Sequence, residues 1–313
     1  MTMASVFDVT LVCLILAVGA WSTFARLTFS AIVIFIVYGL LLSLAWVRLA
    51  AVDVALTEAA IGSGVTGMLL LNAVARLRST DAAPTPSRSS VNIAAGVFCT
   101  LITASLAGLV LVPPQVPVSL APSVMESLGQ SGLGNPVAGV LFVYRSLDTL
   151  LEKVVLVLAL IAVWSLAPDG LWGGKPALRP FPQRDSVLIF LARTVPPIGI
   201  MIGIYMFWVG ADEPGGAFQG GAVLAAMWIL VMIAGLAAVP PTSSHALRLA
   251  LIVGPVVFLA IGILGIFLTG TFLAYPEGYA KPLIIAIEAT LTFSIGVTLA
   301  MHVVGPPERE WRS

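Results

Sequence analysis

Runs of about 20 apolar residues recur along the whole chain, which is the length a helix needs to cross the hydrocarbon core of a bilayer. Hydrophobic residues make up 59% of the chain and charged residues only 10%. This composition is typical of a protein embedded in a membrane. Unpaired backbone groups in lipid cost several kcal/mol each, and the runs lack the alternation of barrel strands. We therefore predict an all-α, polytopic integral membrane protein.

The apolar runs predict about nine transmembrane helices. Two polar connectors, RLRSTDAAPTPSRSS and PDGLWGGKPALRPFPQRDS, divide these helices into blocks of three, two and four. A further segment, 113–138, is rich in Pro, Gly and Ser and is expected to be irregular. The blocks predict three domains, 1–80, 81–186 and 187–313. The predicted spans are 4–25, 28–48, 52–75, 91–112, 140–166, 187–210, 219–239, 246–273 and 282–305.

The positions of Lys and Arg predict how the chain is oriented. Positively charged residues favour the cytoplasmic side, and most of them fall in connectors on one side of the predicted membrane. We therefore predict a cytoplasmic C-terminus and an external N-terminus in the cell inner (plasma) membrane, with only Arg48 and Lys281 against the rule. The first apolar stretch has Asp8 and no basic segment before it, so it is expected to stay as a helix rather than be cleaved.

Several classes of function are not expected. The formal net charge is zero, so no nucleic-acid partner is predicted. Cys13 and Cys99 lie inside apolar runs without a partner motif and are interpreted as ordinary membrane residues. The sequence has no His-Glu-x-x-His motif, no haem motif and no convincing Ser/His/Asp set. We therefore expect no independent enzyme, no catalytic residue, no resident metal and no cofactor.

Four charged residues crowd the start of the predicted span 140–166: Arg145, Asp148, Glu152 and Lys153. Each charge at the bilayer centre costs about 2.5 to 3.5 kcal/mol unless it pairs or meets water. On a helix the first three project within an arc of roughly 60°, with the lysine further round. Two interpretations remain open: a snorkelling cluster that marks the helix end, or a polar stripe along which a proton or cation moves.

Other spans also carry ionisable residues. Glu58 lies well inside the third predicted span, which begins near Asp53, and Glu288 lies inside the ninth. Each glutamate is either a hydrogen-bonded structural carboxyl or part of an ion route, and we favour the route. Arg193 is interpreted as a helix-packing residue and His302 as an interfacial one.

The stretch GADEPGGAFQGGAV, residues 210–223, is the most unusual loop. Its glycines Gly215, Gly216, Gly220 and Gly221 permit tight turns and close backbone approach. The spacing is not that of a Walker loop, and no strand precedes it as a dinucleotide fingerprint requires. A tight turn between two packed helices is therefore the interpretation from the residues themselves.

Three stretches resemble a known family. RTVPPIGIMIGIYMFWVGADEPGGAFQGGAVLAA resembles the start and the Gly-rich loop of the B subunit of Mrp-type multisubunit Na+/H+ antiporters. NPVAGVLFVYRSLDTLLEKVVLVLAL resembles a segment near the C-terminus of the large A subunit, also found as a small subunit of membrane-bound hydrogenases. DVALTEAAIGSGVTGMLLLNAVARL is similar to the short domain before that segment. The chain thus looks like a fusion of the A-subunit tail with the B subunit.

The resemblance implies which residues matter. The residues of an ion or proton route would be Glu58, Arg145, Asp148, Glu152 and Glu288, to which we add the neighbouring Lys153. The signature loop would comprise Gly215, Gly216, Phe218, Gln219, Gly220 and Gly221.

Some positions depart from the family pattern. Ala217 replaces the third loop glycine, Leu151 replaces the glycine before Glu152, and Val143 stands where an acid is common. Asp212 and Glu213 also differ from the residues that are frequent there. The chain lacks the large antiporter-like module of the A subunit, so it is not expected to pump alone.

The sequence therefore predicts a membrane subunit of a multisubunit monovalent cation/proton antiporter. It would line part of an ion route together with other membrane subunits in the lipid bilayer, with Na+ or H+ as the transported ion. Two alternatives remain: an ion-translocating subunit of a hydrogenase-like redox complex, and a non-conducting membrane scaffold.

Overall fold

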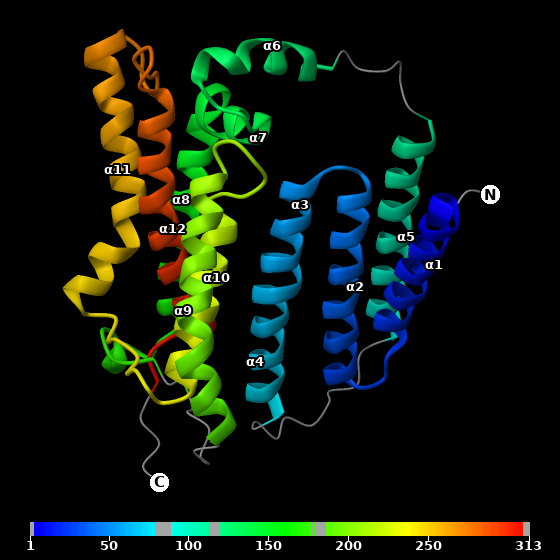
Figure 1. Cartoon of the computed structure of the whole chain (residues 1–313). Coiled ribbons are helices and arrows are strands. Elements are labelled where there is room, and N and C mark those ends of the chain that lie inside the picture. The colour runs from blue at the N-terminus through cyan, green and yellow to red at the C-terminus, as the bar shows by residue number, and fades with distance from the viewer. Residues whose placement is uncertain (1–2, 79–88, 113–118, 177, 179–185, 309–313) are drawn as a thin grey trace.

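The computed structural model is an assembly of helices (Figure 1). It describes residues 3–78, 89–112, 119–176, 178 and 186–308. Within these residues the only β-structure is one isolated bridge, which confirms the predicted all-α fold. Seven helices in the described part of the chain are long and apolar enough to cross a membrane, and α10 is a shorter apolar helix.

The first block of helices comprises α1 to α4. Helices α1 (Met3–Phe24) and α2 (Thr28–Arg48) pack against each other as a hairpin. The third predicted span is composite: α3 (Val52–Thr57) continues into a π-helical segment, η1 (Glu58–Val65), and then into α4 (Thr66–Arg78). A π-helical segment widens the helix and turns its side chains relative to a regular α-helix, and such segments often occur at functional sites.

The middle block comprises α5 to α8 and differs from the prediction. Helix α5 (Ser89–Leu111) lies away from the rest of its block (Figure 1). The segment 113–138 was expected to be irregular, which is wrong for its described part. That part contains α6 (Ala121–Ser131) and α7 (Pro136–Gly139). Helix α6 ends at Gly132, whose φ of 70° is the left-handed conformation that favours glycine at a helix end.

The fifth predicted span is not one continuous α-helix. It consists of α7, the π-helical segment η2 (Val140–Tyr144), a break at Arg145, and α8 (Ser146–Trp164). Arg145 has φ −130° and ψ 34°, outside the α-helical region, and its N–H donates to the carbonyl of Val140. The break therefore places Arg145 at the start of α8, while Asp148, Glu152 and Lys153 lie in the first turns of that helix.

The last block, α9 to α12, forms a bundle reached through a short 3₁₀ turn, η3 (Asp169–Leu171). Its helices are α9 (Ser186–Val209), α10 (Ala217–Ile233), α11 (His245–Thr269) and α12 (Ala280–Val304). Helix α12 packs against the other three and is the most buried of them. Because α12 is central, the side chains that it buries are held in place by α9, α10 and α11.

Burial explains why α12 is central. Ile284, Ile287 and Leu291 recur at helical spacing and are fully buried, together with Phe258 of α11.

Helix α10 ends earlier than the predicted residue 239, because Gly235 adopts a positive φ of 70° directly after the last turn.

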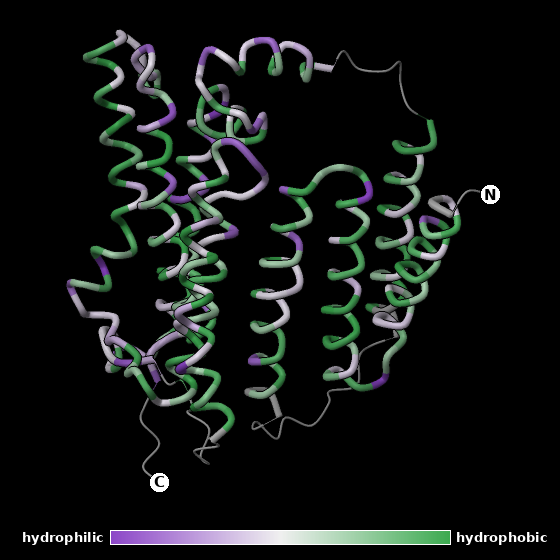
Figure 2. Tube along the Cα trace, in the orientation of Figure 1, coloured by the Kyte–Doolittle hydropathy of each residue, from purple (hydrophilic) through white to green (hydrophobic). Residues whose placement is uncertain are grey.

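The outside of the assembly is apolar. Figure 2 shows hydrophobic residues on all sides of the long helices, while hydrophilic residues gather around α6, α7 and the loop before α10. Helix α5 is an extreme case, with Val97, Phe98 and Leu101 all exposed. Helices that are hydrophobic all round are stable in lipid rather than in water. The chain is therefore a multi-pass membrane protein.

Candidate functional site

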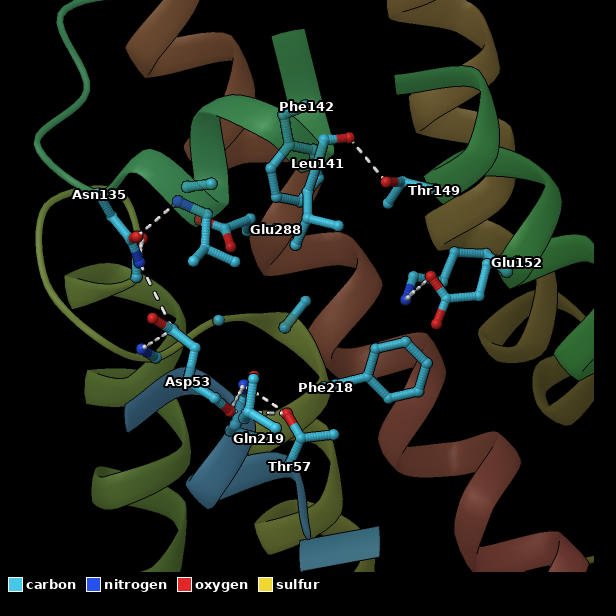
Figure 3. A pocket seen from close by; sticks show the side chains of 18 residues that line it. Asp53, Thr57, Asn135, Leu141, Phe142, Thr149, Glu152, Phe218, Gln219 and Glu288 are labelled. Carbon is cyan, nitrogen blue, oxygen red and sulfur yellow. Dashed lines mark hydrogen bonds and ion pairs between the residues drawn. The ribbon is translucent and has the colours of Figure 1, made fainter. Parts of the chain in front are cut away.

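A cavity of about 270 Å³ lies where the three helix blocks meet (Figure 3). It is lined by α3 of the first block, by α7, η2 and α8 of the middle block, and by α10, α12 and the loop before α10 of the last. The charged side chains that line it are Asp53, Glu152, Lys153 and Glu288. A cavity rich in charge inside an apolar helix assembly is the main candidate for a functional site.

Glu288 of α12 is the most deeply placed of these charges. It is only 2% exposed, and its Oε2 atom has no hydrogen-bond partner among the described residues. The backbone N–H of Ala217, the first residue of α10, donates to the same carboxyl group. The preceding Gly216 has a φ of 132°, which side chains other than glycine rarely adopt. The Gly-rich loop thus aims the start of α10 at Glu288.

Lys153 of α8 is the buried cation of the cavity. Its side chain is 4% exposed, and its Nζ lies 3.3 Å from the centre of the Phe218 ring. The same Nζ is 3.9 Å from Oε2 of Glu152, whose side chain is 52% exposed. It also interacts electrostatically with Glu288. The ammonium therefore sits on an aromatic face between a buried and an exposed carboxylate.

A polar network beside the cavity joins all three blocks. Asn135 accepts a hydrogen bond from the N–H of Val137 and donates to the carbonyls of Gly210 and Glu213, both at 3.1 Å. Asp53 accepts from the N–H of Gly215 at 3.0 Å. These bonds fix the loop before α10 against both α3 and the start of α7.

The signature loop divides between the cavity and helix packing. Gln219 donates to the Thr57 hydroxyl at 3.0 Å, and Phe218 faces Lys153 (Figure 3). Gly220 and Gly221 instead lie at close helix contacts, where a methyl group would meet the backbone of α9 or a side chain of α12.

Three predicted route residues do not line the cavity. Glu58 lies on η1 and points toward α2, since a methyl group on Gly39 would come within 3.2 Å of its carboxylate. Arg145 and Asp148 form an ion pair with each other, as their spacing predicts, and their side chains are 70% and 56% exposed. The structure therefore brings together Glu152, Lys153 and Glu288 and leaves the other three elsewhere.

Arg145 and Asp148 line a separate open groove of about 1040 Å³ beside α6. Tyr275, in the loop between α11 and α12, also lines it. Its hydroxyl is buried without a hydrogen-bond partner among the described residues, and this burial raises the pKa of Tyr275. Tyr275 therefore stays neutral over the physiological pH range.

Sequence reasoning missed some of these residues. Asp53 was noted but not placed at the site, while Asn135 and Thr57 were not singled out. A helix-start signal was present at Asn135, because Asn before Pro136 is a favoured N-cap with proline at the first helical position. No local signal predicts that Asp53 meets Gly215, which is distant in sequence.

Other residues named from the sequence lie apart from the cavity. Cys13 and Cys99 are free and exposed on their helices. His302 bonds the carbonyl of Thr298 in its own helix. Across the described residues, no group of three or more His, Cys, Asp or Glu side chains is arranged to hold a metal ion.

Two family models match the chain. The MbhD family, the D subunit of MBH, matches residues 11–79, and the family described as "Domain related to MnhB subunit of Na+/H+ antiporter" matches residues 187–305. The chain thus joins a segment that resembles MbhD to a segment that resembles MnhB, and we call these the MbhD-type and MnhB-type domains. The loop before α10 and Glu288 lie in the MnhB-type domain, while Asp53 lies in the MbhD-type domain.

Individual proteins agree with this assignment. An uncharacterized protein of Methanocaldococcus jannaschii is 31% identical over 154 residues, covering 44% of this chain and 59% of that protein. A Staphylococcus haemolyticus protein assigned as antiporter subunit mnhB2 is 28% identical over 125 residues, covering 39% of this chain and 89% of that protein. The chain thus spans 59% of the archaeal relative's length.

Solved structures extend the likeness to nearly the whole fold. A chain in the structure of the Mrp complex from Dietzia sp. matches 97% of this chain with a TM-score of 0.74 and 25% identity, and 35% of that chain is covered. A chain of an archaeal membrane-bound sulfane sulfur reductase matches 67% of this chain with a TM-score of 0.53 and 24% identity, and 95% of it is covered. The match to the chain of the Mrp complex, with the family models, confirms the predicted resemblance to Mrp-type antiporter subunits.

Proposed function

We propose that this fusion protein is a membrane subunit of a multisubunit monovalent cation/proton antiporter, and a transporter subunit rather than an enzyme. The observation that carries the proposal is the buried Glu288 carboxylate, which faces a charged cavity at the junction of the three helix blocks. The MnhB-type domain and the likeness to the Mrp complex support the same function. Other membrane subunits of such a complex are its proposed partners.

The cavity would form part of the ion route. Glu152, Lys153 and Glu288 line it directly, so we place these three on the route. Arg145 and Asp148 line the open groove, where an exposed ion pair suits an entrance better than a buried binding site. Glu58 faces α2 and does not line the cavity. We keep it as a proposed route residue only if other subunits of the complex extend the route to it.

The division into domains 1–80, 81–186 and 187–313 remains a proposal. The two matched families fall inside the first and the third of these ranges, which supports it. The middle range would be the linker that carries Lys153 into the shared cavity.

The test of the proposed function uses everted membrane vesicles that contain the assembled complex. With this chain present, adding NaCl or KCl to vesicles acidified by respiration should raise the internal pH, while choline chloride should not. Vesicles whose complex lacks only this chain should show no response. Full exchange without the chain would contradict the proposal, because its cavity could not then be part of the route.

The same vesicles test the proposed orientation. Because everted vesicles expose the cytoplasmic face, a protease added outside should remove a tag fused to the C-terminus. A tag that is cut only after the vesicles are opened would place the C-terminus on the external side of the cell membrane and contradict the predicted orientation.

A redox complex is the second candidate function. The match of residues 11–79 to the MbhD family favours it, since that family is not named for an antiporter. The companions of the purified complex distinguish the two functions. Copurifying subunits with iron–sulfur clusters would support the redox complex, and their absence from an active exchanger would support the antiporter.

A further inference from the structure

The charge in the cavity is unbalanced. Three carboxylates, from Asp53, Glu152 and Glu288, line it with a single ammonium from Lys153. Asp53 is held by the N–H of Gly215 and by Asn135. Glu152 is half exposed and screened by solvent. Glu288, which is 2% exposed, is therefore the cavity carboxyl group with the least solvent screening, and it would attract a cation bound beside it most strongly.

Glu288 offers the cavity an oxygen atom that no described residue binds. Its Oε2 atom is fully buried, has no hydrogen-bond partner among the described residues, and belongs to a side chain that lines the cavity. Thr57, Thr149 and Gln219, whose side chains carry neutral oxygen atoms, line the same space. Hard monovalent cations bind to a combination of one carboxylate with neutral oxygens.

Lys153 is placed to compete for this carboxylate. Its Nζ lies over the Phe218 ring and has two anionic neighbours, the buried Glu288 and the half-exposed Glu152. The lysine side chain is long and has several rotatable bonds. In the structure the ammonium lies within ion-pair distance of the outer carboxylate, and a rotation of this side chain would carry it toward the inner one.

We propose that Glu288 binds a desolvated monovalent cation in this cavity, in competition with the Lys153 ammonium. When the cation is bound, Lys153 pairs with Glu152, as it does in the structure; when the cation leaves, Lys153 moves toward Glu288 and neutralises it. No proton is transferred in this exchange. The inference rests on the proposed function and names the ion-binding residue and its internal competitor.

The structure favours a monovalent over a divalent ion. Within the described residues no three acidic, His or Cys side chains are arranged to hold a metal ion. Divalent ions need several charged ligands or retained water, whereas a single free carboxylate matches one positive charge. A lysine ammonium, itself a single positive charge, is the fitting competitor.

The experiment measures ion binding by the full-length chain purified in detergent. A ligand that binds the folded state raises the melting temperature according to its concentration and Kd. NaCl and KCl are each titrated against N-methyl-D-glucamine chloride at constant ionic strength. The wild type should show a saturable rise with at least one of the two salts, and Glu288→Gln should show none.

The decisive variant is Lys153→Met. Because it removes the competing ammonium, the apparent Kd for the cation should fall about tenfold. The matched control is Lys281→Met, since Lys281 pairs with Asp212 at 2.7 Å on the exposed loop side. That variant should leave the apparent Kd unchanged. If Lys153 only stabilised the fold, its substitution would not make the chain bind the cation more tightly.

Lys153→Gln is the second variant if Lys153→Met does not give a single cooperative melting transition. Unchanged or weaker cation affinity in a folded Lys153 variant would overturn the competition. A wild-type melting temperature that responds to pH but to neither salt would overturn the cation site. If the vesicles still exchange ions, either result overturns the proposed competition or cation site at Glu288 but not the proposed antiporter function. The failure of one proposal can therefore be told apart from the failure of the other.

Discussion

Glu288→Gln in the assembled complex should lower the rate of Na+- or K+-driven proton exchange at least about tenfold. Glutamine has almost the same shape as glutamate but carries no charge, so it cannot attract a cation into the cavity. Glu288 is buried and lines this cavity with no partner for Oε2 among the described residues. The rate is measured from the initial rise of internal pH in everted vesicles.

The control for this prediction is Glu126→Gln. Glu126 lies on the exposed side of α6 and does not line the charged cavity, so its neutralisation should leave exchange unchanged. Glu288→Asp keeps the charge and should retain part of the rate. Immunoblots must show equal amounts of assembled complex. Full exchange with Glu288→Gln would remove this residue from the route.

Gly220→Ala should destabilise the last block by about 2 kcal/mol, which is typical of overpacking at a close contact. The added methyl group would lie 2.6 Å from the carbonyl oxygen of Gly203 on α9 and 3.1 Å from Thr292 on α12. A backbone carbonyl cannot rotate away as a flexible side chain can, so α9 and α10 must separate. The melting temperature of the purified chain measures the effect.

Gly108→Ala is the matched control for this packing prediction. Gly108 lies on α5, where a methyl group would have no neighbour within 4 Å. Its substitution should leave the melting temperature unchanged or slightly higher, because alanine favours a helix over glycine. Equal melting temperatures for Gly220→Ala and the wild type would show that α9 and α10 are not in close contact at this point.

The helices were predictable because their signal is local. An apolar run of sufficient length is enough to predict a helix in lipid, and α1, α2 and α12 begin and end close to the predicted residues. The break at Arg145 was not predictable in this way. It depends on η2 and α8 packing against other helices, and the sequence there has charged residues but no proline or glycine that would indicate a break.

The site was only partly predictable for a related reason. Sequence spacing places Arg145, Asp148 and Glu152 near one another, and their side chains are indeed exposed. The adjacent Lys153 is buried instead, because one residue along a helix turns the side chain by about 100°. Glu288, which lines the same cavity and interacts electrostatically with Lys153, comes from another block, and only tertiary packing brings the two together.

The resemblance to the Mrp family identified Glu288 and the Gly-rich loop but could not show how they are related. The structure shows the loop's Gly216 placing the N–H of Ala217 on the Glu288 carboxyl group. The substitution of the family's third loop glycine by Ala217 is compatible with this contact, because Ala217 uses its backbone and begins α10.

The central claim is that the cavity between the three blocks is part of the ion route. The most direct test is Ala138→Cys, since Ala138 of α7 lines the cavity and is small. Cys13 and Cys99 are first replaced by serine, and Ala104→Cys on exposed α5 is the control. A small, positively charged thiol reagent should block exchange through the cavity variant, with protection by Na+ or K+, and leave the control active. Complete labelling of Ala138→Cys without loss of exchange would contradict the claim.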